Sequence, residues 1–294
     1  MPTTIPIAFS KLLDNLQITD LQDATVTIRQ QNIRDAVAKE LTVLTSFVTG
    51  SYRRNTLLAP LAKADIDIFV ILDPKYYATD GYANLIDRVK RVMKATYPNT
   101  PEISRNGQAV TVSFTDFRVD VVPAFHRQGG GYLIPDCVMK RWISTDPTRH
   151  VAIWNDANIA HRAQLVPVLK MIKQWNRAHS ALLRSFHLET LVVQILTNVN
   201  ISDMPSAARY VFDKAREATR YVVSDPAGYS GDIAAYLDTT EKISEVVKRF
   251  ETAYTQAAEA ERLAASNQIQ QAFAKWRTVF GDPFPAYGVA TRFF

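Results

Sequence analysis

The chain has 294 residues, of which 47% are hydrophobic and 21% are charged, so it has the length and composition of one large or two ordinary folded domains. This composition excludes a disordered chain, and the single cysteine, Cys137, excludes an internal disulfide framework and a multi-cysteine zinc site. The net charge of +5 favours polyanionic partners without separating nucleotides, nucleic acids and acidic membrane surfaces. We find neither a signal peptide nor a membrane-spanning segment, and we expect a cytoplasmic protein.

A long helix is predicted near the N-terminus, over residues 21–48. Apolar residues recur there at spacings of three and four, which places them on one face of a helix. They are Ile33, Val37, Leu41, Leu44 and Val48. Gly50 is expected to end this helix, so that Ser51 stands at its C-terminal end.

Two acidic residues enter the first predicted strand, in the segment Ala64-Asp-Ile-Asp-Ile-Phe-Val70. Because side chains alternate along a strand, Asp65 and Asp67 share one face, whereas the isoleucines between and after them point to the core. Two neighbouring carboxylates repel each other unless protons or cations neutralise them, so the pair indicates a hard divalent metal. Solvated acids at a strand edge would produce the same short pattern.

A third acid, Asp120, stands among valines in a later predicted strand. An ionised carboxylate is costly to bury alone, so Asp120 should pair either with a basic residue such as Arg118 or with a metal ion. Beside Asp65 and Asp67 it would complete a triad able to hold two ions. Asp116, by contrast, is expected to be a turn residue.

The second half of the chain is predicted to be helical. Residues 128–131, Gln-Gly-Gly-Gly, predict a turn, and helical spacing dominates from about Ala160. We therefore predict an α+β fold in which residues 1–155 form a lobe with a β-sheet and residues 156–294 form a helical lobe. The C-terminal Arg292-Phe-Phe294 is interpreted as either a flexible tail or a docking peptide.

A basic stripe is predicted on the helix around residues 165–175. Lys170, Lys173 and Arg177 recur at spacings of three and four, opposite its apolar face. Such a stripe is usually a solvated face. Ser185 would make a good N-cap for the next helix, and the free amides of a helix N-terminus also attract anions.

In order and spacing, Gly50-Ser51, then Asp65-x-Asp67, then Asp120 resemble the motif of polymerase-β-like nucleotidyltransferases. Within that superfamily, the segment GSYRRNTLLAPLAKADIDIFVIL is similar to bacterial relatives of cyclic GMP-AMP synthase and oligoadenylate synthetase, the CD-NTase or SMODS proteins. A lysine in the helix at 165–175, a Ser-aromatic pair at 185–186 and the final Trp-x-x-x-Phe-Gly agree, so the resemblance covers nearly the whole chain. Arg53-Arg54-Asn55 departs from many relatives, which end this segment in Gly-Thr.

The resemblance implies an enzyme with a mixed β-sheet lobe that carries a long N-terminal helix and is packed on a helical C-terminal lobe. It assigns catalysis and the binding of two Mg²⁺ or Mn²⁺ ions to Asp65, Asp67 and Asp120. It assigns nucleotide binding to a larger set: Gly50, Ser51, Arg53, Lys170, Lys173 and Ser185. Of the two lysines, Lys173 matches the family's phosphate lysine better.

By the same resemblance, the substrates are nucleoside triphosphates, ATP among them, and the product is a cyclic di- or trinucleotide second messenger in bacterial anti-phage signalling. Regulatory or effector proteins of such a system are then expected partners. Two alternatives stay open at this point: transfer to an RNA or tRNA end or a small molecule, and a catalytically silent sensor of nucleotides or nucleic acids. Retention of all three acids argues against the silent sensor.

Overall fold

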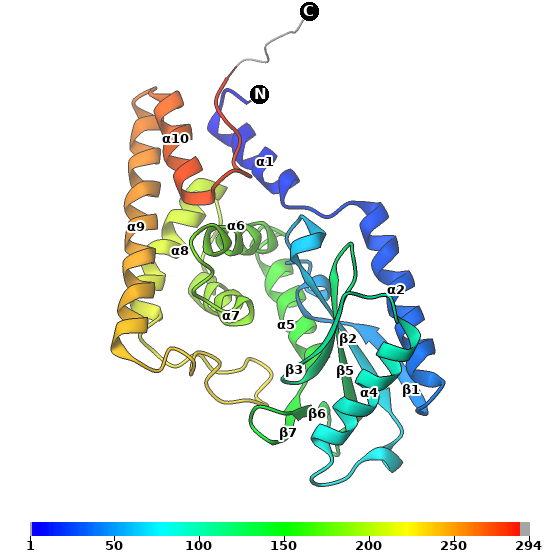
Figure 1. Ribbon diagram of the computed structural model, residues 1–294. Coiled ribbons are helices and arrows are strands. Elements are labelled where there is room, and N and C mark those ends of the chain that lie inside the picture. Colours follow the sequence, from blue (N-terminus) through cyan, green and yellow to red (C-terminus); the bar gives the residue numbers. More distant parts are fainter. Residues whose placement is uncertain (1, 289–294) are drawn as a thin grey trace, which may run out of the picture. The chain divides into compact units, whose positions relative to one another are not determined.

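The computed structural model describes residues 2–288, and the chain forms two compact units (Figure 1). The sheet unit comprises Ile18–Ile153 and Ala227–Ser230, and the helical unit comprises Trp154–Pro226 with the described residues before Ile18 and after Ser230. The predicted α+β fold is confirmed. The division into two lobes at residue 155 stays a prediction. Residues 292–294, interpreted above as a tail or a docking peptide, lie outside the described part of the chain.

A seven-stranded mixed sheet organises the sheet unit. Strands β2 and β5 pair in parallel at its centre, and the other strand pairs are antiparallel. The order is β1-β2-β5-β4-β3, with β6 and β7 continuing from the end of β5. The strands are β1 (Val43–Val48), β2 (Asp65–Leu72), β3 (Glu102–Asn106), β4 (Ala109–Ser113), β5 (Arg118–His126), β6 (Tyr132–Asp136) and β7 (Arg141–Thr145).

Two helices, α2 (Asp20–Ala38) and α4 (Tyr82–Thr96), pack on each other and on the sheet (Figure 1). Their apolar faces and the apolar face of the central strands form one buried core, which includes Ile66 and Ile68 of β2 and Val119 and Val121 of β5. Short helices lie in the connections: α3 (Gly50–Arg53) and the 3₁₀ turns Leu61–Lys63 and Pro74–Tyr76. Helix α5 (Pro147–Ala160) leads from this unit into the helical one.

The helix predicted over residues 21–48 is wrong in its second half. Helix α2 begins with a capping box, in which Thr19 and Gln22 exchange side-chain-to-backbone hydrogen bonds, and it ends at Ala38. The following Val43–Val48 forms β1, antiparallel to β2. A spacing of four, as between Leu44 and Val48, fits both helical and strand periodicity, and the β-branched residues of this segment favour the strand.

Two predicted turns are confirmed. Asp116 lies in the bend between β4 and β5, where it forms an ion pair with Arg29 at 2.8 Å. The glycines at 129–131 connect β5 to β6, and all three have positive φ angles, of 88°, 100° and 70°.

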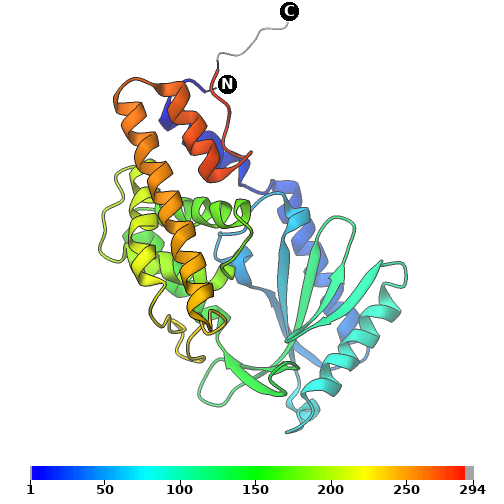
Figure 2. The ribbon, with the colours of Figure 1, turned by 60° about the vertical axis from the view of Figure 1, so that its left-hand side comes forward.

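The helical unit contains the remaining long helices, and in Figure 2 the longest of them, α9, runs beside α8 and α10. The N-terminal α1 joins them because Phe9 packs edge-on against Trp276, Phe280 and Phe284, with ring centroids 4.9 to 5.8 Å apart. Among the described helices, none has the length and apolar character needed to cross a membrane. The helices are α1 (Ile5–Asn15), α6 (Leu165–Ala178), α7 (Ser185–Leu196), α8 (Met204–Ala218), α9 (Thr240–Ala265) and α10 (Ile269–Phe280).

Candidate active site

Three acidic side chains lie on one face of the two parallel central strands. In the register of β2 and β5, Asp65 stands opposite Arg118 and Asp67 stands opposite Asp120. Residues directly opposite each other, and residues two apart along one strand, share a face of the sheet. The intervening Ile66 is fully buried on the other face. Asp65, Asp67 and Asp120 therefore project from the same side of the sheet.

Arg118 is the ion-pair partner of Asp65. Its Nε lies 2.7 Å from Asp65 Oδ1, and both side chains are about half exposed, at 51% and 46%. An ion pair as exposed as this stabilises a protein by only about 0–1 kcal/mol, so it is readily exchanged for another partner. An ion pair of Arg118 with Asp120, one of the two alternatives that the sequence left open, is not the one formed.

Asp120 is held by neutral groups instead. Its carboxylate accepts a hydrogen bond from Thr111 Oγ1 at 2.5 Å and a longer one from Asn106 Nδ2 at 3.4 Å. Burial raises the pKa of the Asp120 carboxyl, and the neighbouring charge of Asp65 raises it further, against the lowering effect of the Thr111 hydrogen bond. Asp120 therefore accepts a proton more readily than an ordinary aspartate.

The Gly-Ser turn lies directly beside Asp67. The Thr49 N–H donates to the Asp67 carbonyl at 2.8 Å, and Gly50 follows with φ at +64°. A Cβ atom on Gly50 would stand 1.8 Å from Asp67 Oδ2, so any other residue there would displace the Asp67 carboxylate. Ser51 lies in the short helix α3 after β1, and not at the end of a long helix as predicted. Arg53, also in α3, is exposed.

The donor chemistry of this face suits a hard divalent cation, because three carboxylates offer the oxygen ligands that such ions prefer. The side chains as described do not yet surround an ion: among residues 2–288, no three His, Cys, Asp or Glu side chains gather closely enough. Asp65 is turned toward Arg118. Binding of an ion by all three acids would therefore require Asp65 to exchange Arg118 for the metal.

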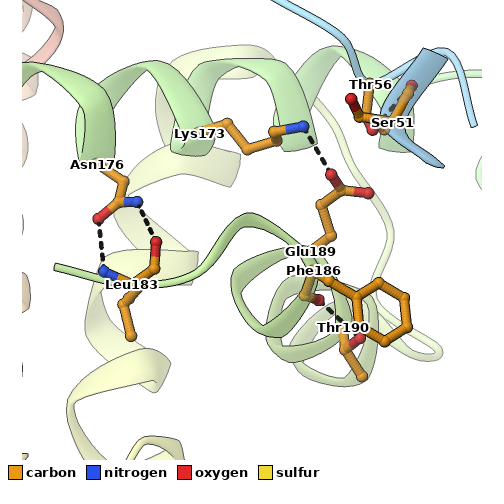
Figure 3. A network of polar contacts seen from close by, with 8 residues as sticks. All are labelled: Ser51, Thr56, Lys173, Asn176, Leu183, Phe186, Glu189 and Thr190. Atoms are coloured by element: carbon orange, nitrogen blue, oxygen red, sulfur yellow. Dashed lines mark hydrogen bonds and ion pairs between the residues drawn. The ribbon is translucent and has the colours of Figure 1, made fainter. Parts of the chain in front are cut away.

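The two lysines of the predicted basic stripe are buried, so the interpretation as a solvated face is wrong for them. Lys170 and Lys173 are only 5% and 7% exposed. Lys170 Nζ donates to Gln17 Oε1 at 2.6 Å, and burial, with the nearby charge of Lys173, lowers the pKa of Lys170 to about 8. Lys173 Nζ lies 2.6 Å from Glu189 Oε1 (Figure 3). Glu189 was not predicted from the sequence as this partner.

Ser185 is the first residue of α7, and the N-cap position belongs to Arg184, so the predicted cap is wrong by one residue. The start of α7 is fixed by side chains from elsewhere in the helical unit. The Asn176 amide bonds both the carbonyl and the N–H of Leu183, and Tyr236 Oη accepts from the Arg184 N–H at 2.9 Å. Ser185 is exposed at this ordered helix start.

A mixed sheet with acids on neighbouring parallel strands, next to a Gly-Ser turn, defines the class of the protein as a nucleotidyltransferase. The family model described as Second Messenger Oligonucleotide or Dinucleotide Synthetase domain (SMODS) matches residues 4–158, and the chain belongs to this family. It is therefore an enzyme of the cyclic nucleotide synthase type, in a family that depends on divalent metal ions.

Known proteins that are similar to this chain over most of their own length support this assignment. The chain is 26% identical to a cyclic AMP-AMP-AMP synthase of an Acinetobacter species, over 91% of this chain and 83% of the relative. Its fold resembles that of the Vibrio cholerae di-nucleotide cyclase, solved as a point mutant in complex with ATP and GTP, with a TM-score of 0.80, 15% identity and 97% of both chains covered. It also resembles Escherichia coli CdnC in a complex with HORMA-deltaN, with a TM-score of 0.75, 16% identity, and 96% of this chain and 98% of that one covered.

Proposed function

We propose that the enzyme joins nucleoside triphosphates, ATP among them, into a cyclic di- or trinucleotide second messenger for bacterial anti-phage signalling. The observation that carries this proposal is the common face of Asp65, Asp67 and Asp120 beside the Gly50 turn, in a chain of the SMODS family. The Acinetobacter relative is named for a cyclic trinucleotide, and the Vibrio structure contains ATP and GTP, which supports these substrates.

The three acids are proposed to hold two ions, Mg²⁺ or Mn²⁺, which when bound would neutralise the charge on the triphosphate and on the leaving pyrophosphate. The role proposed for Asp120 follows from its surroundings. Its carboxylate lies on the common face with Asp65 and Asp67, where it could take the proton from an attacking hydroxyl as a general base. Thr111 would hold that carboxylate in a fixed orientation.

Contacts with the triphosphate are proposed for six residues on the basis of the family resemblance: Gly50, Ser51, Arg53, Lys170, Lys173 and Ser185. A backbone that no side chain obstructs, as at Gly50, lets a phosphate approach main-chain N–H groups. Buried lysines and an exposed serine at the start of α7 offer charge and hydrogen-bond donors to an anion. A regulatory or effector protein is also a proposed partner, supported by the CdnC complex.

The test is incubation of the purified protein with four labelled ribonucleoside triphosphates and Mg²⁺ or Mn²⁺, followed by phosphatase treatment. Wild type should yield a phosphatase-resistant product. Asp120→Asn should reduce the rate by about 10²–10⁴-fold without loss of folding, because the general base and a metal ligand are removed together. Asp116→Asn is the matched control. Asp116 is an aspartate of the same unit, lies in a bend and pairs with Arg29.

Three results would count against the proposal. Retention of most activity by Asp120→Asn would remove Asp120 from the chemistry, and an equal loss in Asp116→Asn would point to destabilisation of the sheet unit instead. A product that forms only on added RNA would favour transfer to an RNA end over synthesis of a second messenger.

A further inference from the structure

The ion pair between Lys173 and Glu189 is almost completely removed from water. The two side chains are 7% and 0% exposed, and they reach toward each other from α6 and α7 (Figure 3). On α7, Glu189 stands among the buried Leu188, Leu191 and Val192. Burying two opposite charges is costly, and replacing such a pair by apolar side chains is often neutral or stabilising. The pair therefore needs a reason other than stability.

Lys170, one turn before Lys173 on the same helix, shows what burial does to an ammonium whose partner is uncharged. Lys170 is 5% exposed and donates to the amide oxygen of Gln17. Burial and the charge of Lys173 lower the pKa of Lys170 to about 8, so that it loses its proton near neutral pH. Lys173 is as deeply buried, but its partner is a carboxylate, which stabilises the charged form of the lysine.

We propose that Glu189 is a positioning residue that keeps Lys173 protonated and holds its ammonium in place for contact with the triphosphate. This inference rests on the proposed role of Lys173 in binding that triphosphate. The oxygens of a triphosphate accept hydrogen bonds most strongly from a charged donor. A neutral Lys173 would offer a much weaker one, so the carboxylate of Glu189 acts on the substrate through the lysine.

Other hydrogen bonds hold the backbone of this region. The effect of the charge of Glu189 can therefore be measured separately from the effect of its size. Asn176 bonds both backbone groups of Leu183 and so fixes the connection from α6 to α7. Thr190 Oγ1 donates to the Phe186 carbonyl at 2.9 Å within α7 (Figure 3). Replacing Glu189 by glutamine changes its charge at nearly constant volume and leaves these contacts in place.

Other charged groups of the helical unit lie near this pair. Lys170 and Arg177 stand on the same helix, and Glu189 faces it from α7. Helices α1, α8 and α10 also pack on α6, and three contacts from these parts of the unit come from uncharged groups. These are the Gln17 amide with Lys170, the Phe212 ring with Trp175, and the Phe280 carbonyl with Gln174.

The experiment measures the affinity of the full chain for a non-hydrolysable ATP analogue with Mg²⁺, by isothermal titration calorimetry at pH 7 and pH 9. Each variant is compared with wild type at the same pH, because Lys170 titrates in this range in both. Lys173→Met should weaken binding at both pH values. Glu189→Gln should weaken binding by about tenfold at pH 9, the value of one charge-assisted hydrogen bond, and much less at pH 7.

Two further variants separate charge from structure. Lys173→Arg added to Glu189→Gln should restore binding at pH 9, because a guanidinium keeps its proton at that pH without a carboxylate partner. Thr190→Val, a buried isosteric change in the same helix, should leave the pH dependence unchanged. If Glu189→Gln does not fold, Glu189→Asp replaces it, with a smaller pH-dependent loss expected because its carboxylate is shorter by one methylene.

The possible failures are distinguishable. If Glu189→Gln, or Glu189→Asp where that variant is used instead, binds the analogue with the pH dependence of wild type, the inference is overturned. The proposed function would still stand. Unchanged binding in Lys173→Met would overturn it by removing Lys173 from the triphosphate site. Absence of analogue binding and of any nucleotide product in wild type would refute the proposed function itself, and the inference with it.

Discussion

Replacing Gly50 by alanine should abolish most activity at a small cost in stability. Gly50 has φ at +64°, a conformation that costs a residue with a side chain roughly 1–2 kcal/mol. At about 2–4 °C per kcal/mol for a chain of 150–250 residues, the melting temperature should fall by only a few degrees. The new Cβ would stand 1.8 Å from Asp67 Oδ2, so the carboxylate must move by more than an ångström. A displacement of that size next to the chemistry costs about 100-fold in rate.

The matched control for this substitution is Gly228→Ala. Gly228 lies in the same unit with φ at +79°, but a Cβ there would meet nothing within 4 Å. Both variants should show a similar fall in melting temperature by differential scanning fluorimetry, and only Gly50→Ala should lose product formation in the labelled-nucleotide assay. Activity within about threefold of wild type for Gly50→Ala, well below the 100-fold expected, would refute the placement of Asp67 beside the turn.

Two stability measurements test the helical unit. Burial lowers the pKa of His187 from 6.5 to about 4, so the unfolded chain binds a proton that the folded chain does not. The free energy of unfolding in urea should therefore fall by roughly 3 kcal/mol between pH 6.5 and pH 4, and an equally steep fall in His187→Phe would contradict this origin. Phe9→Ala should cost about 3–5 kcal/mol because it removes a ring packed against Trp276 and Phe280, whereas Ile7→Ala, on the exposed face of α1, should cost under about 0.5 kcal/mol.

The arrangement of the acids could be predicted because it depends on local geometry. A period of two along a strand places Asp65 and Asp67 on one face wherever that strand lies in the protein. That Asp120 joins them was expected from the family resemblance, but the parallel pairing with β5, which brings Asp120 opposite Asp67, was not predicted. The ion pair of Asp65 with Arg118 depends on that register, and no local pattern in either strand predicts it.

Predictions failed where contacts from distant parts of the chain determine the outcome. The lysines of α6 have the spacing of a solvated stripe, yet both are buried, and one of their partners is Gln17, 153 residues earlier. Ser185 has the right side chain for an N-cap, but Tyr236 binds the N–H of Arg184, which is the N-cap, and the helix begins at Ser185, one residue earlier than predicted. A partner for Glu189 could have been predicted, because an acid that stands among leucines and valines needs one. The same reasoning identified Asp120.

The partner of each buried charge determines which chemistry that charge can perform. Asp120 has a hydroxyl partner in Thr111, which orients the carboxylate without cancelling its charge, so that the charge stays available to a metal ion or a proton. Lys170 has an amide partner and a pKa of about 8, so its charge varies near neutral pH. Lys173 has a carboxylate partner, Glu189, and is the one of the two lysines suited to carry a constant charge. Because a triphosphate needs constant positive charge and an attacking hydroxyl needs a base, the two kinds of pairing match the two requirements of nucleotidyl transfer.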